Sequence, residues 1–188
     1  DFAFMLEKVP GSYLLIGNCD GTDGGTFAGH ACVFGVEDLA RDVVEPGAFR
    51  ATLARRGAAG IKMLWHHDPA EPIGRWLEIR EDGRGLFVRG RVLGEVARGR
   101  EALALMRAGV LDGLSIGFKT VKGRRDARSG VRRLAEIDLW EISLVTFPMQ
   151  PAARVASVEA ARGVGSDLPA AALAATIRRA AALLDTKR

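Results

Sequence analysis

The sequence predicts an α+β fold in which short strands predominate and a few helices flank them. Its 188 residues are 48% hydrophobic, which is enough to bury the core of one domain. The apolar stretches are short, many alternate with polar residues, and most end near Gly, Pro or Asp, as strands do. Helical spacing of apolar residues is confined mainly to residues 48–56, 96–108 and 168–184.

The first half of the chain is predicted to form mostly strands. They are expected at residues 13–17, 26–34, 61–65, 73–80 and 86–93, with one helix at residues 48–56. Gly29 is typical of a bulge within the second strand. Phe49 and Leu53 lie four residues apart and are expected on the buried face of the helix. Pro69 and Pro72 are expected to end sheet pairing after the third strand, because proline has no N–H to donate.

The second half is predicted to pair its strands around an arginine-rich loop. A helix at residues 96–108 ends at Gly109, and a strand at 111–121, a polar loop at 122–130 and one or two strands at 131–148 follow it. Side chains alternate between the two faces of a strand. In the last strand, alternation places Leu139, Glu141 and Ser143 on one face and Trp140, Ile142 and Leu144 on the other.

The chain is expected to fold as one domain with a tail. The domain covers residues 1–155, and a flexible link with a C-terminal helical tail covers residues 156–188. Gly163 and Gly165 interrupt the alanine-rich tail, and Pro169 suits the first turn of its last helix. That helix has too few large apolar residues to form a core, so the tail is expected to be detachable.

No metal, cofactor or membrane is expected. Cys19 and Cys32 are too few for a disulfide framework, lack the spacing of a zinc site and are expected to be buried free thiols. Asp38, Asp42 and Glu45 lack the glycine turn of a calcium loop and are expected to face solvent. No stretch approaches the roughly 20 apolar residues that span a bilayer, and no secretory signal is recognised, so a soluble cytoplasmic protein is expected.

The net charge of +4 is concentrated in an arginine-rich stretch at residues 124–133. Such a stretch binds nucleic acid or an acidic protein surface in some proteins, but it is more commonly a solvated hairpin. Neither interleaved aromatic residues nor a known nucleic-acid motif accompanies these arginines. Nucleic-acid binding is therefore the less favoured interpretation.

Three stretches carry the residue types of a hydrolase triad. Ser115 lies between two apolar residues of a strand and is expected to face away from both, as a displayed hydroxyl. His66 and His67 end an apolar strand, where only one of them is expected to face Ser115, and Glu141 lies inside another. A serine nucleophile needs a histidine base and a group that orients the base. Spacing alone leaves open a structural interpretation, in which Ser115 bonds the sheet, His67 caps a turn and Glu141 pairs with an arginine.

Five blocks in the same order resemble the prohead maturation proteases of tailed phages of the HK97 type, which are distant relatives of the herpesvirus assembly protease. The resemblance runs from about residue 29 to about residue 155. The blocks are FGVEDLARDVVEPGAF, KMLWHHDPAEPIG, GLFVRGRVL, GVLDGLSIGF and EISLVTFPMQPAA. Five ordered blocks are far more specific than a triad pattern.

The resemblance implies a closed or nearly closed, mainly antiparallel β-barrel with flanking helices, like that of the herpesvirus assembly protease. It implies Ser115 as the nucleophile and His67, the histidine before the Asp-Pro of its block, as the general base. Glu141 is the preferred third member. The herpesvirus relatives use a second histidine there, for which His30 and His66 are the candidates, although a histidine within a strand is usually a packed residue with one bonded nitrogen.

The resemblance also implies a serine endopeptidase that cuts scaffold segments from the major capsid protein, and cuts itself, during prohead maturation. Its expected place is inside the assembling prohead, in the cytoplasm of a bacterial host. The tail would hold the enzyme in the shell until self-cleavage frees it. Self-association is left open. The alternative is a capsid assembly module that kept the barrel and lost its activity.

Overall fold

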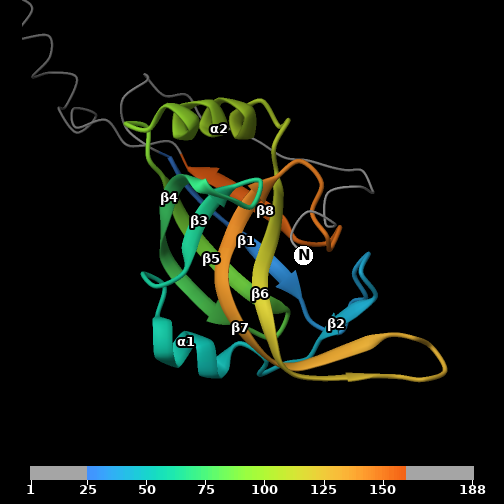
Figure 1. Cartoon of the computed structure of the whole chain (residues 1–188). Helices are drawn as coiled ribbons and strands as arrows, with labels where there is room; N and C mark the ends of the chain where they lie inside the picture. The colour runs from blue at the N-terminus through green and yellow to red at the C-terminus, as the bar shows by residue number, and fades with distance from the viewer. Residues whose placement is uncertain (1–24, 160–188) are drawn as a thin grey trace, which may run out of the picture.

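In residues 25–159, which a computed structural model describes, eight strands pair into one sheet and seven of them close into a barrel (Figure 1). In chain order the elements are β1 (Thr26–Val33), β2 (Asp42–Val44), α1 (Arg50–Arg56), β3 (Lys62–Trp65), β4 (Asp68–Glu81), β5 (Gly85–Val92), α2 (Ala97–Arg107), β6 (Gly113–Arg125), β7 (Arg132–Val145) and β8 (Arg154–Glu159). The pairing runs β7, β3, β4, β5, β1, β8, β6 and returns to β7, while β2 joins the sheet at β7. Most pairs are antiparallel, so the predicted mainly antiparallel β-barrel with flanking helices is confirmed.

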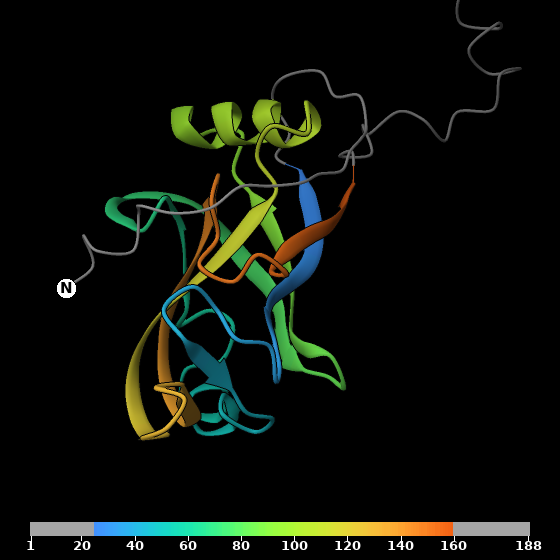
Figure 2. The same ribbon diagram turned by 90° about the vertical axis from the view of Figure 1, so that its right-hand side faces the viewer.

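Inward side chains of the strands fill the barrel. Fully buried members of this core include Phe27, Met63, Leu86, Leu114, Leu134 and Ile142. Helix α2 packs against β4 and β5 across one end of the barrel, and α1 packs against β7 and β4 near the other end (Figure 1, Figure 2). Phe49 is fully buried beside α1 and Leu53 packs against the core, as expected. The alternation that fills the core turns the remaining side chains of β6 and β7 to the outer face.

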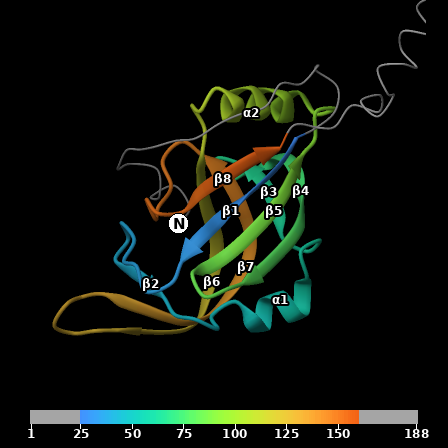
Figure 3. The ribbon, with the colours of Figure 1, turned by 180° about the vertical axis from the view of Figure 1, so that it is seen from behind.

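Strands β6 and β7 extend beyond the barrel as a two-stranded ribbon (Figure 1, Figure 3). β6 runs to Arg125 and β7 begins at Arg132, so the loop expected at residues 122–130 lies at 126–131 and the prediction is wrong for residues 122–125. The cause is cross-strand pairing, which holds polar residues in strand geometry that their composition does not favour. Lys122 on one strand, for example, forms an ion pair with Glu136 on the other.

Strand β2 buries a carboxylate that was expected to face solvent. Asp42 is buried, and Arg132 Nε donates a hydrogen bond of 2.7 Å to its Oδ1. The prediction of a solvent-facing Asp42 is wrong because β2 runs parallel to β7, where Asp42 lies opposite Arg132. A carboxylate away from water needs a charged partner of this kind.

A β-bulge in β7 changes which side chains face the core. Phe118 of β6 pairs with Leu139 of β7. The preceding residue, Gly117, pairs with Glu141, so Trp140 is an extra residue on β7. Leu139 is therefore buried and Trp140 exposed. A bulge puts two neighbouring side chains on the same side of the strand, here Trp140 and Glu141 on the outer side. The strict alternation expected for this strand is therefore wrong for Leu139 and Trp140.

Two prolines lie within β4, although they were expected to end the pairing. β4 begins at Asp68 and contains Pro69 and Pro72. Leu64 of β3 pairs with Pro72, and the register shifts on both sides of Leu64. Proline is tolerated at such irregularities because its missing N–H interrupts no regular ladder there. The expectation that Pro69 and Pro72 stop sheet pairing is therefore wrong.

Strand β8 closes the barrel and was not expected as a strand. It pairs with β1 and runs to Glu159, past the boundary expected at Val155. The register between β1 and β8 shifts just before Gly29, where a bulge was expected. A Cβ at Gly29 would collide with the Arg154 backbone carbonyl, so glycine allows the two backbones to approach.

Several expectations concern residues outside the described range. They are the strand at 13–17, the state of Cys19, and the link and helical tail beyond residue 159. Within the described range, neither helix is long and apolar enough to cross a membrane.

The turn before β2 contains a carboxyl group with a shifted pKa, Asp38. Its Oδ1 accepts hydrogen bonds from the backbone N–H groups of Ala40 and Asp42, at 2.9 and 2.8 Å. Burial, with the negative charge of Asp42 as a further cause, raises the pKa of Asp38 to about 6 despite these bonds. Because the folded state then holds the proton more tightly than the unfolded state, the ionised side chain lowers stability above this pH.

We therefore predict that Asp38→Asn, which keeps the accepting oxygen, stabilises the protein at pH 8 by about 1–2 kcal/mol, a value reduced for partial solvent screening. The advantage falls between pH 6 and 4 and vanishes below, where the wild-type carboxyl is protonated in both states. Urea unfolding of both proteins across this range measures it. A difference that does not change with pH, or that grows as the pH falls, contradicts the account.

Candidate active site

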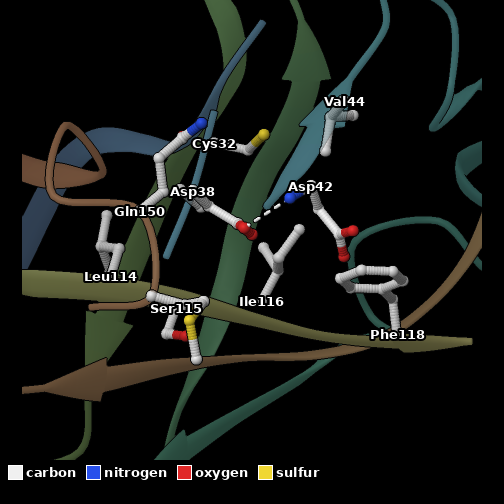
Figure 4. A pocket seen from close by; sticks show the side chains of 11 residues that line it. Cys32, Asp38, Asp42, Val44, Leu114, Ser115, Ile116, Phe118 and Gln150 are labelled. Atoms are coloured by element: carbon white, nitrogen blue, oxygen red, sulfur yellow. Dashed lines mark hydrogen bonds between the residues drawn. The ribbon is translucent and has the colours of Figure 1, made fainter. Parts of the chain in front are cut away.

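Strand β6 carries Ser115 on the outer face of the barrel. Leu114 and Ile116 rise from the other side of the strand (Figure 4), so Ser115 faces away from both, as expected. The hydroxyl is not displayed, however, since Ser115 is only 4% exposed. Met149 and Gln150, in the segment after β7, share with it the lining of a small cavity of about 20 Å³, room for one water molecule. The expectation of a displayed hydroxyl is wrong because a segment distant in sequence packs beside β6.

His66 and His67 form the two-residue turn between β3 and β4. Trp65 pairs with Asp68 across the turn, and the histidine φ angles are positive, 48° and 63°. Positive φ at both central residues is typical of a type I′ hairpin turn, which usually contains asparagine or glycine. Histidine adopts this conformation more readily than most residues, but the conformation still costs about 1 kcal/mol or more. Other contacts are therefore needed to hold the turn.

Those contacts come from β7 and also orient the His67 ring. His67 Nδ1 lies 2.6 Å from Glu141 Oε1, and because a carboxylate only accepts hydrogen bonds, Nδ1 carries the hydrogen. Ser143 Oγ donates to Glu141 Oε2 at 2.7 Å and accepts the His67 backbone N–H at 3.0 Å. Only 9% of the His67 side chain and 7% of the Glu141 side chain are exposed. We call His67, Glu141 and Ser143 the His67 cluster.

Pairing of β6 with β7 brings Ser115 beside the His67 cluster. Ser115 pairs with Ser143, so their Cα atoms lie about 4.5–5.5 Å apart and their side chains share the outer face. Gly117 pairs with Glu141 in the same way. A Cβ at Gly117 would collide with the Glu141 carboxylate, so glycine leaves room for that carboxylate over β6. Serine, histidine and carboxylate therefore gather on one face.

The other two histidines make different contacts. His66 packs edge-on against Trp65, with ring centroids 4.5 Å apart. Burial, followed by nearby positive charge, lowers the pKa of His66 and favours its neutral form. His30 Nε2, on β1, lies 3.0 Å from Asp82 Oδ2. His30 is thus a packed residue with one bonded nitrogen, and within residues 25–159 neither histidine forms a hydrogen bond or ion pair with Ser115 or Glu141.

The small cavity beside Ser115 also contains a cysteine. Burial, with further contributions from the charges of Asp38 and Glu81, raises the pKa of the Cys32 thiol to about 12. The expected buried free thiol is confirmed for Cys32, and at neutral pH it is protonated and unreactive. Ser115, the other nucleophilic side chain that lines this cavity, lies on the strand that pairs with β7, whose Glu141 and Ser143 bond His67. Among residues 25–159, no three His, Cys, Asp or Glu side chains are grouped to hold a metal ion.

Two residues of the site were not singled out from the sequence. Ser143 was placed on the Glu141 face by alternation, two residues away, but no partner was assigned to it. Gly117 follows Ser115 by two residues, and a glycine inside a strand is a known signal of close approach by another group. Both signals are present in the sequence. The pairing of β6 with β7 is needed to show that Ser143 lies opposite Ser115 and Gly117 opposite Glu141.

Comparison with known proteins places the chain in a family. The model of the caudovirus prohead serine protease family matches residues 15–164. The chain is 33% identical over 142 residues to the prohead protease of Enterobacteria phage HK97, covering 74% of this chain and 63% of that protein. It is 25% identical over 113 residues to the prohead protease of Escherichia phage T5, covering 60% of this chain and 53% of that protein. The chain thus spans less than two thirds of the length of either relative.

A solved structure supports the fold. The crystal structure of KSHV protease in complex with a hexapeptide phosphonate inhibitor is similar to this chain with a TM-score of 0.50 and 11% identity, over 85% of this chain and 77% of that one. At this identity the likeness concerns the barrel alone. The family match, in contrast, includes every strand of the barrel and all the residues of the site. The chain belongs to the caudovirus prohead serine protease family.

Proposed function

We propose that this chain is a serine endopeptidase in which Ser115 is the nucleophile, His67 the general base and Glu141 the group that orients the base. The His67–Glu141 hydrogen bond, on the face shared with Ser115, carries the proposal. With the hydrogen on Nδ1, the nitrogen that accepts a proton is Nε2, across the ring from Glu141. An inactive assembly module, the alternative, has no need of a nearly buried histidine–carboxylate pair beside a serine.

In the proposed reaction, His67 Nε2 takes the Ser115 proton as Oγ attacks the peptide carbonyl carbon. His67 then gives this proton to the leaving amine, and an acyl-enzyme remains on Ser115. A water molecule, deprotonated by His67, then attacks the ester, and the new carboxyl end leaves as Ser115 Oγ takes that proton back from His67. Glu141 stabilises the imidazolium in both halves of the reaction without becoming protonated. Backbone N–H groups would stabilise the oxyanion.

We further propose that Ser143 is a positioning residue. One hydroxyl holds both the backbone of the turn, through the His67 N–H, and the orienting carboxylate of Glu141. Because Ser143 is fully buried, its removal would leave a buried N–H and a carboxylate oxygen unpaired. Each such loss costs about 1–3 kcal/mol, which is enough to move the ring.

For the substrate, we propose the scaffold segment of a major capsid protein, together with a site in the chain itself. The names of two relatives, both prohead proteases, support this choice. They also support a place of action inside the assembling prohead, in the cytoplasm of a bacterial host. On sequence grounds, the segment after residue 159 keeps its proposed role as a tail that delivers the enzyme to the shell.

Nucleic-acid binding by the ribbon of β6 and β7 remains the less favoured proposal. Arg132 is engaged with Asp42, and Arg125 donates to the backbone carbonyl of Gly130. The Asp42 carboxylate offsets the charge of Arg132, and Arg125 keeps its charge but uses one of its donors to hold the ribbon.

The first test is co-expression with a candidate major capsid protein, followed by intact-mass measurement of that protein. We predict that Ser115→Ala and His67→Ala fold but abolish processing, a loss of about 10⁴-fold or more, because each reacting group is indispensable. The control is His66→Gly, which retains the positive φ of the turn and is expected to keep processing. Processing by the Ser115→Ala protein contradicts the assignment and favours the inactive-module alternative.

A graded loss is predicted within the His67 cluster. Glu141→Gln is expected to lower kcat by roughly 10²–10⁴-fold, less than loss of Ser115, because it misorients the base without removing it. Ser143→Ala is expected to lower kcat by about 10–100-fold with little change in KM, since only the position of the base is affected. Ser143→Thr retains a hydroxyl and is expected to restore most of the activity.

Kinetics on a peptide that contains the mapped cleavage junction measure this order, and thermal unfolding of each variant controls for folding. If Ser143→Ala raises KM and leaves kcat unchanged, Ser143 contacts substrate and does not position His67. If Glu141→Gln is fully active, another group orients the base.

A further inference from the structure

The β-bulge in β7 turns a large aromatic side chain outward beside the proposed catalytic groups. Trp140 is the extra residue of the bulge and directly precedes Glu141. It is 55% exposed, although regular alternation would have placed it in the core. Bulges occur often beside active sites, where they re-aim a side chain. The position of Trp140 therefore calls for a role other than core packing.

Trp140 is exposed but held in place. Its Nε1–H donates a hydrogen bond of 2.8 Å to Asp138 Oδ2. Arg56 of α1 lies 5.6 Å from the ring centroid and binds the same carboxylate at 3.0 Å. A fixed indole loses little conformational entropy when it contacts a ligand, which is why such aromatic residues recur in binding sites.

Trp140 borders a pocket of about 440 Å³ on the outer face of β3 and β7. Small-ligand pockets run from about 300 to 1,000 Å³, so this one has room for one or two amino-acid side chains. Its lining is Lys62, Leu64, His67, Pro69, Trp140 and Glu141. Two members of the His67 cluster thus form part of the wall. Of the other four residues, Leu64, Pro69 and Trp140 are apolar and Lys62 is charged.

We propose that this pocket, which we call the Trp140 pocket, binds an apolar side chain of the peptide substrate. The inference rests on the proposed protease function and adds a substrate preference to it. Ser115 lies on β6, and the pocket lies over β7 and β3, one to two strands away. Strands are spaced about 4.8 Å apart and an extended peptide advances about 3.3 Å per residue. The bound side chain therefore belongs to a residue within about three positions of the scissile bond.

The lining determines which side chains are accepted. Leu64, Pro69 and the Trp140 ring offer apolar contacts, so aliphatic or aromatic groups gain most from leaving water. A basic side chain would lose hydration against this largely apolar wall, and the two charged members of the lining, Lys62 and Glu141, are opposite in sign and offer it no net attraction. A small polar side chain would gain little. The preference is thus for an aliphatic or aromatic residue over a basic or small polar one.

The test is a double-mutant cycle between Trp140 and the substrate. The junction cut in the co-expressed capsid protein is mapped by mass spectrometry, and a peptide that spans it is synthesised with each of the three residues on either side replaced in turn by serine. In the wild-type enzyme, replacement of one apolar residue is expected to lower kcat/KM by about 10–100-fold. In the Trp140→Ala enzyme, the same replacement is expected to lower kcat/KM by less than about 3-fold.

Two variants serve as controls. Trp140→Phe keeps an aromatic wall and is expected to retain the preference. Val121→Ala removes a side chain of similar exposure, 52%, from the ribbon of β6 and β7. This variant is expected to show the wild-type kcat/KM for every peptide. The wild-type enzyme and Val121→Ala are both expected to react with a small fluorophosphonate at the same rate, because that reagent needs Ser115 and His67 but not the ribbon.

The outcomes are distinguishable. If the wild-type enzyme cuts its substrate but the Trp140→Ala effect is the same for every peptide, or if no apolar residue lies within three positions of the cut, the pocket inference is overturned. If the wild-type chain neither cuts the capsid protein nor reacts with the fluorophosphonate, the proposed protease function fails, and the pocket inference fails with it.

Discussion

The register between β6 and β7 is the constraint on which both the barrel and the site depend. This pairing closes the barrel and sets Ser115 opposite Ser143 and Gly117 opposite Glu141. A slip of one residue would turn Ser115 inward and expose Leu114, because side chains alternate along a strand. The buried apolar residues of β6 and β7 therefore stabilise the same register that assembles the site. Stability and the geometry of the proposed catalysis are coupled through one strand pair.

Two local departures from regular structure complete the site on this frame. The turn at His66 and His67 adopts positive φ, which brings His67 over β7, and a hydrogen bond from its N–H to Ser143 holds it there. The bulge at Trp140 resets the alternation so that Glu141 faces outward toward His67 while Leu139 remains buried. Each departure is unfavourable by itself. Both are retained because contacts with the surrounding sheet stabilise them, a pattern that is common at functional sites.

The sequence predicts much of this arrangement from local pattern. Alternation gives the direction of Ser115, and the isolated carboxylate inside an apolar strand singles out Glu141. The choice of His67 over His66 came from the resemblance, and the structure shows which of the two bonds Glu141. The helices and the hairpin of β4 and β5 also follow from spacing and turn residues.

The failures have a common physical origin. The burial of Asp42, the strand geometry of the ribbon and the pairing of Pro72 depend on partners that are far away in sequence. Local propensity contains no information about such partners. The bulge is missed for the same reason, since one extra residue on β7 is defined only relative to β6.

The central claim, that Ser115 is activated by His67 and Glu141, is tested most directly by the site of reaction with a fluorophosphonate. In this reaction a bond forms between serine Oγ and phosphorus, fluoride leaves, and the histidine takes the hydroxyl proton. The full chain is treated with the reagent, digested and mapped by mass spectrometry, with the Glu141→Gln protein in parallel. We predict one adduct, on Ser115, formed far more slowly in the variant. An adduct on another serine, or equal rates in the two proteins, would contradict the account.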